Sequence, residues 1–100
     1  MITHIDIRDD IGALWENFCV IERLKHLQAE GRRVRSYYWR NNDQREIDII
    51  EEEGDALRAY ECKAGAKINA KIPLAFTKLY PSYTFDIVNP NNYPDVLLKV

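Results

Sequence analysis

The chain has 100 residues, of which 46% are hydrophobic and 30% are charged, and its formal net charge is −2. This length suits one small domain with a single core, and no apolar run approaches the roughly 18 residues that a membrane span needs. The slightly acidic balance argues against strong autonomous binding to DNA, because such domains usually carry a basic surface. The polar N-terminus does not resemble a secretory leader, and Cys19 and Cys62 form no C-x-x-C pattern, so we expect a cytoplasmic protein with reduced thiols.

The first predicted helix spans residues 10–30. Asp9 or Asp10 can cap its start, and Gly31 suits the left-handed position after its end. Its apolar residues form one stripe, which we expect to face the core. The stripe contains Ile11, Leu14, Trp15, Phe18 and Ile21, widened by Val20, Leu24 and Leu27. Glu16 lies at the border of this stripe, where it is either a solvated side chain or close enough to reach a site at a sheet edge.

The first predicted strand spans residues 34–40 and is rich in aromatic residues, namely Tyr37, Tyr38 and Trp39. Aromatic side chains beside arginines either pack in the core and at the sheet edge or stack on nucleic-acid bases. Residues 41–44 form a polar turn.

A hairpin is predicted from residue 45 to residue 63, with its turn near Gly54. With an even number of loop residues, Glu53 and Gly54 form the tip and Glu46 lies opposite Glu61. Alternation then gives one face that is charged at one end and apolar near the turn. This face contains Glu46, Asp48, Glu61 and Lys63, with Ile50, Leu57 and Ala59 nearer the turn. An odd loop or a bulge would break this register.

Three carboxylates and an ammonium group at the charged end of this face suggest a site. Asp48 and Glu61 can supply oxygen ligands to Mg²⁺. Lys63 lies two strand residues from Glu61, roughly 6.6 Å along the strand, and could orient a water or balance the charge of a phosphate. The alternative is an ordinary charged face in which Lys63 pairs with one carboxylate, an interaction that contributes roughly 0–1 kcal/mol when exposed.

The rest of the chain predicts a loop, a helix and a last strand. The loop at residues 64–72 carries Lys67 and Lys71, which either face a phosphate backbone or belong to a mobile basic loop. Pro73 begins a second helix that Pro81 ends.

Residues 84–88 read as a strand, and residues 93–100 as a short helix or an edge strand. The sequence therefore predicts an α/β domain with a mixed sheet of about four strands.

The run Ile47-Asp-Ile-Ile50 followed by Glu61-Cys-Lys63 resembles the D…(D/E)-x-K signature of the PD-(D/E)XK nuclease superfamily. Residues 10–18, 37–40, 46–48 and 60–63 carry a second resemblance. Together they resemble the C-terminal domain of unknown function that is attached to many bacterial and archaeal AAA-type ATPases. This second resemblance extends from about Asp6 to Tyr93.

The resemblance implies a restriction-endonuclease-like fold with the order α-β-β-β-α-β. It implies that Asp48 and Glu61 hold Mg²⁺ or Mn²⁺, with the carbonyl of Cys62 as a further ligand, and that Lys63 and Glu16 complete the catalytic set. Active members would cleave phosphodiester bonds in DNA. The alternative is a non-catalytic docking domain that keeps only the nuclease fold.

The resemblance also implies that the chain is a single domain, residues 1–100, from the C-terminal part of a longer prokaryotic ATPase, with the ATPase domain as its partner. The chain has no G-x-x-x-x-G-K-[ST] loop, so we expect no ATP binding through such a motif. Residues expected to contact nucleic acid are Arg40, Arg45, Lys67 and Lys71. Exposed sheet edges would also allow a homo-oligomer.

Overall fold

The computed structural model describes residues 7–40, 46–65 and 72–99. Along the chain the elements are α1 (Ile7–Ala29), β1 (Arg35–Arg40), β2 (Glu46–Glu53), β3 (Ala56–Cys62), α2 (Leu74–Leu79), β4 (Thr84–Val88) and α3 (Tyr93–Leu97). The predicted α/β class and the order α-β-β-β-α-β are confirmed, and the segment that follows Asn92 is a short helix. Helix α1 begins three residues before the predicted start.

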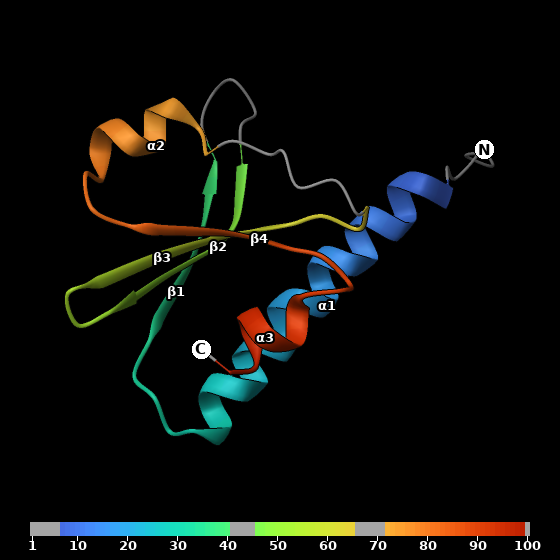
Figure 1. Ribbon diagram of the computed structural model, residues 1–100, viewed down its shortest axis with the longest axis horizontal. Coiled ribbons are helices and arrows are strands. Elements are labelled where there is room, and N and C mark those ends of the chain that lie inside the picture. The colour runs from blue at the N-terminus through green and yellow to red at the C-terminus, as the bar shows by residue number, and fades with distance from the viewer. Residues whose placement is uncertain (1–6, 41–45, 66–71, 100) are drawn as a thin grey trace, which may run out of the picture.

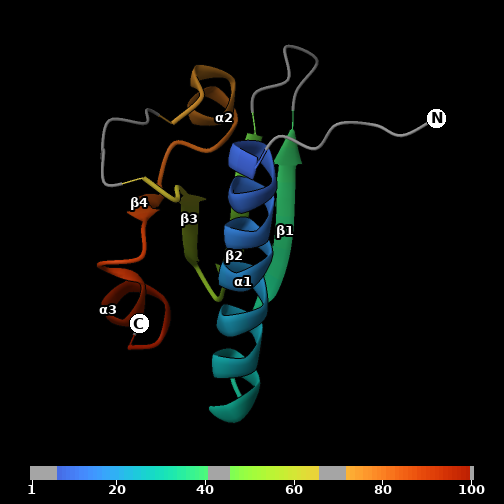
Figure 2. The same cartoon turned by 90° about the vertical axis from the view of Figure 1, so that its right-hand side faces the viewer.

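The four strands form one mixed sheet in the order β1-β2-β3-β4 (Figure 1). The first three strands are antiparallel to their neighbours, whereas β4 runs parallel to β3. A parallel neighbour requires a crossover connection, and α2 lies within that connection. Figure 2 shows the long helix α1 crossing in front of the sheet, with α3 beside it and α2 at one end.

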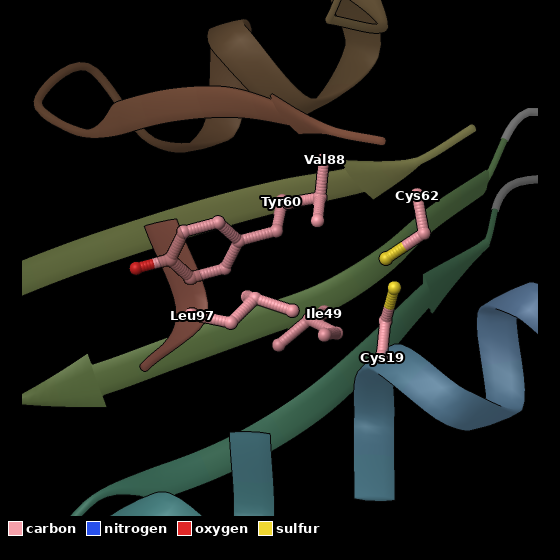
Figure 3. Close-up of a cluster of buried hydrophobic side chains, with 6 residues drawn as sticks. All are labelled: Cys19, Ile49, Tyr60, Cys62, Val88 and Leu97. Atoms are coloured by element: carbon pink, nitrogen blue, oxygen red, sulfur yellow. The ribbon is translucent and has the colours of Figure 1, made fainter. Parts of the chain in front are cut away.

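Two clusters of buried side chains hold the layers together. The first joins α1 and α3 to the sheet and contains Cys19, Ile49, Tyr60, Cys62, Val88 and Leu97 (Figure 3). The second lies under α2 and contains Ile47, Ile50, Ala59 and Phe76. The sulfur atoms of Cys19 and Cys62 point toward one another in Figure 3, and both residues are free cysteines, as the sequence predicts.

The hairpin between β2 and β3 has a different register from the predicted one. Ile49 pairs with Tyr60 and Glu53 pairs with Ala56, so Gly54 and Asp55 form the tip. Gly54 has φ of 57°, a left-handed conformation that glycine adopts without steric cost at the first position of such a tight turn. The predicted tip at Glu53 and the pairing of Glu46 with Glu61 are therefore wrong. Continuing the observed register brings Asp48 level with Glu61.

A β-bulge also breaks the predicted alternation. Tyr37 pairs with Ile50 and Trp39 pairs with Ile47, so the single residue between them on β1 faces two residues, Asp48 and Ile49, on β2. As a result Ile47 and Ile50 both pack in the cluster under α2, whereas Ile49 packs toward α1 and α3. The sequence predicted that Asp48 and Ile50 lie on the same face by strict alternation. The bulge between Ile47 and Ile50 breaks that alternation, so this prediction is wrong.

The predicted stripe of α1 packs on the core only in part: Leu27 is buried, and Trp15 and Val20 are partly buried against the first cluster. Over residues 11–29 of α1, the buried residues are Cys19, Arg23 and Leu27, with exposed fractions of 0%, 1% and 5%. Most of the predicted stripe is exposed instead: Ile11, Leu14, Phe18, Ile21 and Leu24. Arg23 explains the difference, because its side chain pairs with buried Glu51 and orients this side of the helix toward the sheet.

The end of α1 follows the sequence closely. Gly31 has φ of 65°, its N–H donates to the carbonyl of Gln28, and the N–H of Arg32 donates to the carbonyl of Leu27. These two bonds are those of a Schellman motif, which satisfies the last carbonyls of a helix. The predicted role of Gly31 is confirmed.

Candidate active site

Asp48 occupies the bulge of β2 and is anchored to the end of β3. Its Oδ2 accepts a hydrogen bond from the backbone N–H of Cys62 at 2.8 Å. Because the bulge disrupts the ladder locally, a side chain here takes the place of a backbone acceptor. The bond fixes the Asp48 carboxylate beside Glu61, the residue that precedes Cys62.

Glu61 lies on β3 with only 13% of its side chain exposed. Burial, followed by the negative charge of Asp48 and a hydrogen bond with it, raises the pKa of Glu61 to about 8, while Lys63 acts in the opposite direction. In the absence of a cation, Glu61 therefore keeps its proton at neutral pH. A carboxyl pair of this kind gains most when a cation replaces that proton.

Lys63 follows the end of β3 and approaches the pair from the solvent side. Its Nζ lies 3.6 Å from Oε1 of Glu61, and half of its side chain is exposed. Its backbone N–H donates to the carbonyl of Val88 at 2.8 Å, which ties the residue to β4. The predicted pairing of Lys63 with a carboxylate is confirmed for Glu61.

Glu16 joins this group from α1. Burial raises its pKa, and the negative charges of Asp48 and Glu46 raise it further, while Lys63 lowers it. These shifts show that the side chain lies within electrostatic reach of the strand carboxylates. The fold thus brings Asp48, Glu61 and Lys63 together at one end of the sheet and leaves Glu16 of α1 within electrostatic reach of them.

A cavity of about 310 Å³ lies between α1 and β1, and Asp48 forms part of its wall. Val20 and Leu24 of α1 and Tyr37 and Tyr38 of β1 give it a largely apolar lining. Its volume is at the lower end of the range for small-ligand pockets.

The residues expected to contact nucleic acid are only partly visible. Arg40 donates from Nη2 to Oε1 of Glu46 at 2.7 Å and lies over the ring of Tyr38, 5.9 Å from its centroid. Arg45, Lys67 and Lys71 lie outside the described residues. The contact with Tyr38 was not predicted, although the run of aromatic residues beside Arg40 was its signal.

The donors present suit a magnesium site that substrate completes. Among the residues that the structure describes, no three histidine, cysteine, aspartate or glutamate side chains are grouped so as to hold a metal. Asp48 and Glu61 nonetheless supply two carboxylates side by side. Mg²⁺ is commonly held by one or two carboxylates, with waters and substrate phosphates as its other ligands.

The comparisons with known proteins identify a family but no reaction. No curated protein and no solved structure matches the chain. Within the described ranges, no helix is both long and apolar enough to cross a membrane. The chain matches the family described as "Domain of unknown function (DUF4143)" over residues 11–93. Since this match covers most of the 100 residues, the chain belongs to that family.

Proposed function

We propose that this domain is a nuclease-like module that hydrolyses phosphodiester bonds of DNA with Mg²⁺ or Mn²⁺. The observation that carries the proposal is the pair of Asp48 and Glu61, whose side chains hydrogen-bond to each other. Nζ of Lys63 lies 3.6 Å from Oε1 of Glu61. Phosphodiester hydrolysis needs a site for a divalent cation and a positive group near the attacking water. These three residues supply both.

Each residue has a distinct role in this proposal. Asp48 and Glu61 hold the cation, which lowers the pKa of a bound water and polarises the phosphate when it is present. Glu61 gives up its proton when the cation enters, and the bond from the Cys62 N–H keeps the Asp48 carboxylate in place. Lys63 orients the water or balances charge on the phosphate. Glu16 holds a second water at the border of the site.

The resemblance to the D…(D/E)-x-K signature supports the proposal, because its three positions are the residues that the sheet brings together. The same resemblance supports a setting in which the domain is the C-terminal part of an AAA-type ATPase.

A titration with Mn²⁺ tests the metal site directly. We expect saturable binding by calorimetry and a rise in melting temperature for the wild type, and the loss of both for Asp48→Asn. Asp55→Asn at the exposed hairpin tip is the matched control and should behave like the wild type. Cleavage of linear and single-stranded DNA with Mn²⁺ should then be abolished by Asp48→Asn and by Lys63→Ala. Metal-dependent cleavage that both variants leave unchanged would refute the proposal.

A second candidate function is docking onto the ATPase part of a longer protein without catalysis. The observation that favours it is β1, an edge strand on which Arg35, Ser36, Tyr37, Tyr38 and Arg40 are all exposed. An open strand edge can pair with a strand of another domain. Binding of the purified adjoining ATPase part, lost on Tyr37→Pro and unaffected by Asp48→Asn, would favour docking over catalysis.

A further inference from the structure

Helix α1 carries apolar side chains on two opposite sides. The inner side packs on the sheet through Cys19 and Leu27. The outer side presents Ile11, Leu14 and Ile21 with 51%, 60% and 55% of their surface exposed. A helix that is apolar all round is normally buried on all sides. In Figure 2 α1 lies in front of the sheet with α3 on one side of it, and among the described residues of the outer side only Phe18 has a ring contact with α3, through Tyr93.

The exposed residues have the spacing of a coiled-coil contact. Ile11, Leu14, Phe18 and Ile21, which we call the outer seam, follow one another at intervals of three, four and three residues. These are the a and d positions of two heptads, the pattern that packs one helix against another. Cys19 and the other inner residues do not belong to this repeat, so core packing does not explain it.

The outer seam is electrically neutral along its length. The only charged residue between Ile11 and Ile21 is Glu16, whose pKa shifts place it beside the strand carboxylates on the inner side. Ala13 and Asn17 are the exposed neighbours of the seam. Two identical seams can therefore approach without bringing like charges together, a conflict that would otherwise disfavour self-association.

The order of the seam residues is self-complementary in an antiparallel pair. If two copies of α1 cross about a two-fold axis, Ile11 meets the partner's Ile21 and Leu14 meets the partner's Phe18, and each contact occurs twice. The orientation of the Phe18 ring is fixed by two neighbours. It stacks on Trp15 with ring centroids 5.4 Å apart and packs edge-to-face with Tyr93, with centroids 5.3 Å apart. The four seam residues offer an apolar patch on the order of 400 Å², half of what each partner contributes to a standard interface.

We propose that the outer seam is a homodimer interface in which α1 of a second copy packs antiparallel against α1. The remaining contact area comes from the side chains that flank the two helices. This proposal is independent of metal binding, since Asp48, Glu61 and Lys63 do not take part in it.

Sedimentation equilibrium of the wild-type chain, up to about 0.1 mM, measures the association. We expect a mass near twice 11.8 kDa. Leu14→Glu places a charge at the centre of the seam and should weaken dimerisation by about 30-fold or more. Leu79→Glu, an exposed leucine on α2, is the matched control and should leave the dimer intact. Circular dichroism and thermal melts show whether each variant is folded.

Cysteine cross-linking tests the direction of the pair. A mixture of Ile11→Cys and Ile21→Cys copies should form a disulfide-linked dimer, whereas Ile11→Cys alone should not, because its two copies would lie about 15 Å apart along the axis. The natural cysteines are buried and should not interfere. A wild type that stays monomeric throughout, a dimer that folded Leu14→Glu does not weaken, or cross-linking of Ile11→Cys alone would overturn the proposal.

Discussion

Arg23 and Glu51 form a bidentate ion pair in the interior of the domain. Nε and Nη2 of Arg23 donate to the two carboxylate oxygens of Glu51 at 2.7 and 2.8 Å, and the side chains are 1% and 0% exposed. Nη1 of Arg23 donates to the carbonyl of Leu97 at 2.8 Å, and Arg58 donates to Glu51 from the neighbouring strand. One buried carboxylate and one buried guanidinium thus connect α1, β2, β3 and α3.

Removing one partner of this pair should destabilise the domain strongly. Glu51→Leu leaves the buried guanidinium of Arg23 without its counter-charge, a change that typically costs about 3–5 kcal/mol. Urea denaturation of both proteins measures the difference in the free energy of unfolding. Lys25→Ala breaks the exposed pair of Lys25 with Glu22 and should cost no more than about 1 kcal/mol. Equal costs for the buried and the exposed pair would contradict this prediction.

The stability of the metal-free protein should fall as the pH rises through the titration of Glu61. Its pKa is about 8 in the folded state and 4.5 as the ordinary value, so the folded state holds this proton more tightly. The resulting stabilisation is complete below pH 4.5 and is lost as the pH rises to about 8. Between these two pH values the free energy of unfolding falls by no more than about 1.4 kcal/mol for each pH unit. Glu61→Gln mimics the protonated form and should flatten this part of the profile.

Melting temperatures in buffer that contains a chelator measure this effect between about pH 5 and about pH 9. Glu52→Gln, an exposed glutamate of β2, is the matched control and should keep the slope of the wild type. An unchanged slope in Glu61→Gln would show that Glu61 titrates normally.

The contribution of Glu53 to stability should have the opposite pH dependence to that of Glu61, and it should change at lower pH. Hydrogen bonds from Arg32 and Arg58 lower the pKa of Glu53 to about 2. Its contribution is therefore present above pH 4.5 and is lost as the pH falls toward about 2. Glu53→Gln should unfold with a smaller dependence on pH in acid-denaturation curves than the wild type. A steeper acid transition in the variant would contradict the assignment.

Gly12 within the first helix and Gly31 just after its end should respond oppositely to alanine. Gly31 has φ of 65°, where an alanine costs about 1–2 kcal/mol, so Gly31→Ala should destabilise the domain. Gly12 lies inside α1 with open space around the position of a Cβ, so Gly12→Ala should stabilise it by about 0.5–1 kcal/mol. Paired urea melts compare the two variants, and shifts of the same sign would contradict the prediction.

Local signals in the sequence were enough for the order of the elements. Gly31 and the prolines at residues 73 and 81 mark helix ends through constraints on φ that depend on no distant residue. The grouping of Asp48, Glu61 and Lys63 also followed from local pattern, because a short turn fixes which strands are neighbours.

The parts that the sequence analysis missed depend on contacts between distant segments. The bulge at Asp48 is visible only against β1, and one additional residue there moves its neighbours to the other side of the sheet. The choice of the inner side of α1 depends on Arg23 finding Glu51, 28 positions away. Amphipathic pattern alone favoured the opposite side, which carries more apolar residues.

The bond from Arg23 to the carbonyl of Leu97 spans 74 positions, and the indole of Trp15 reaches the carbonyl of Val88 over 73. These contacts have a consequence for synthesis on the ribosome. The first helix is made early, but β2 and β3 cover only part of its inner side, and the rest waits for the last strand and helix to emerge. The core therefore closes in a single late step, and a nascent chain stalled before Val88 would expose Cys19, Leu27 and the charge of Arg23 to chaperones.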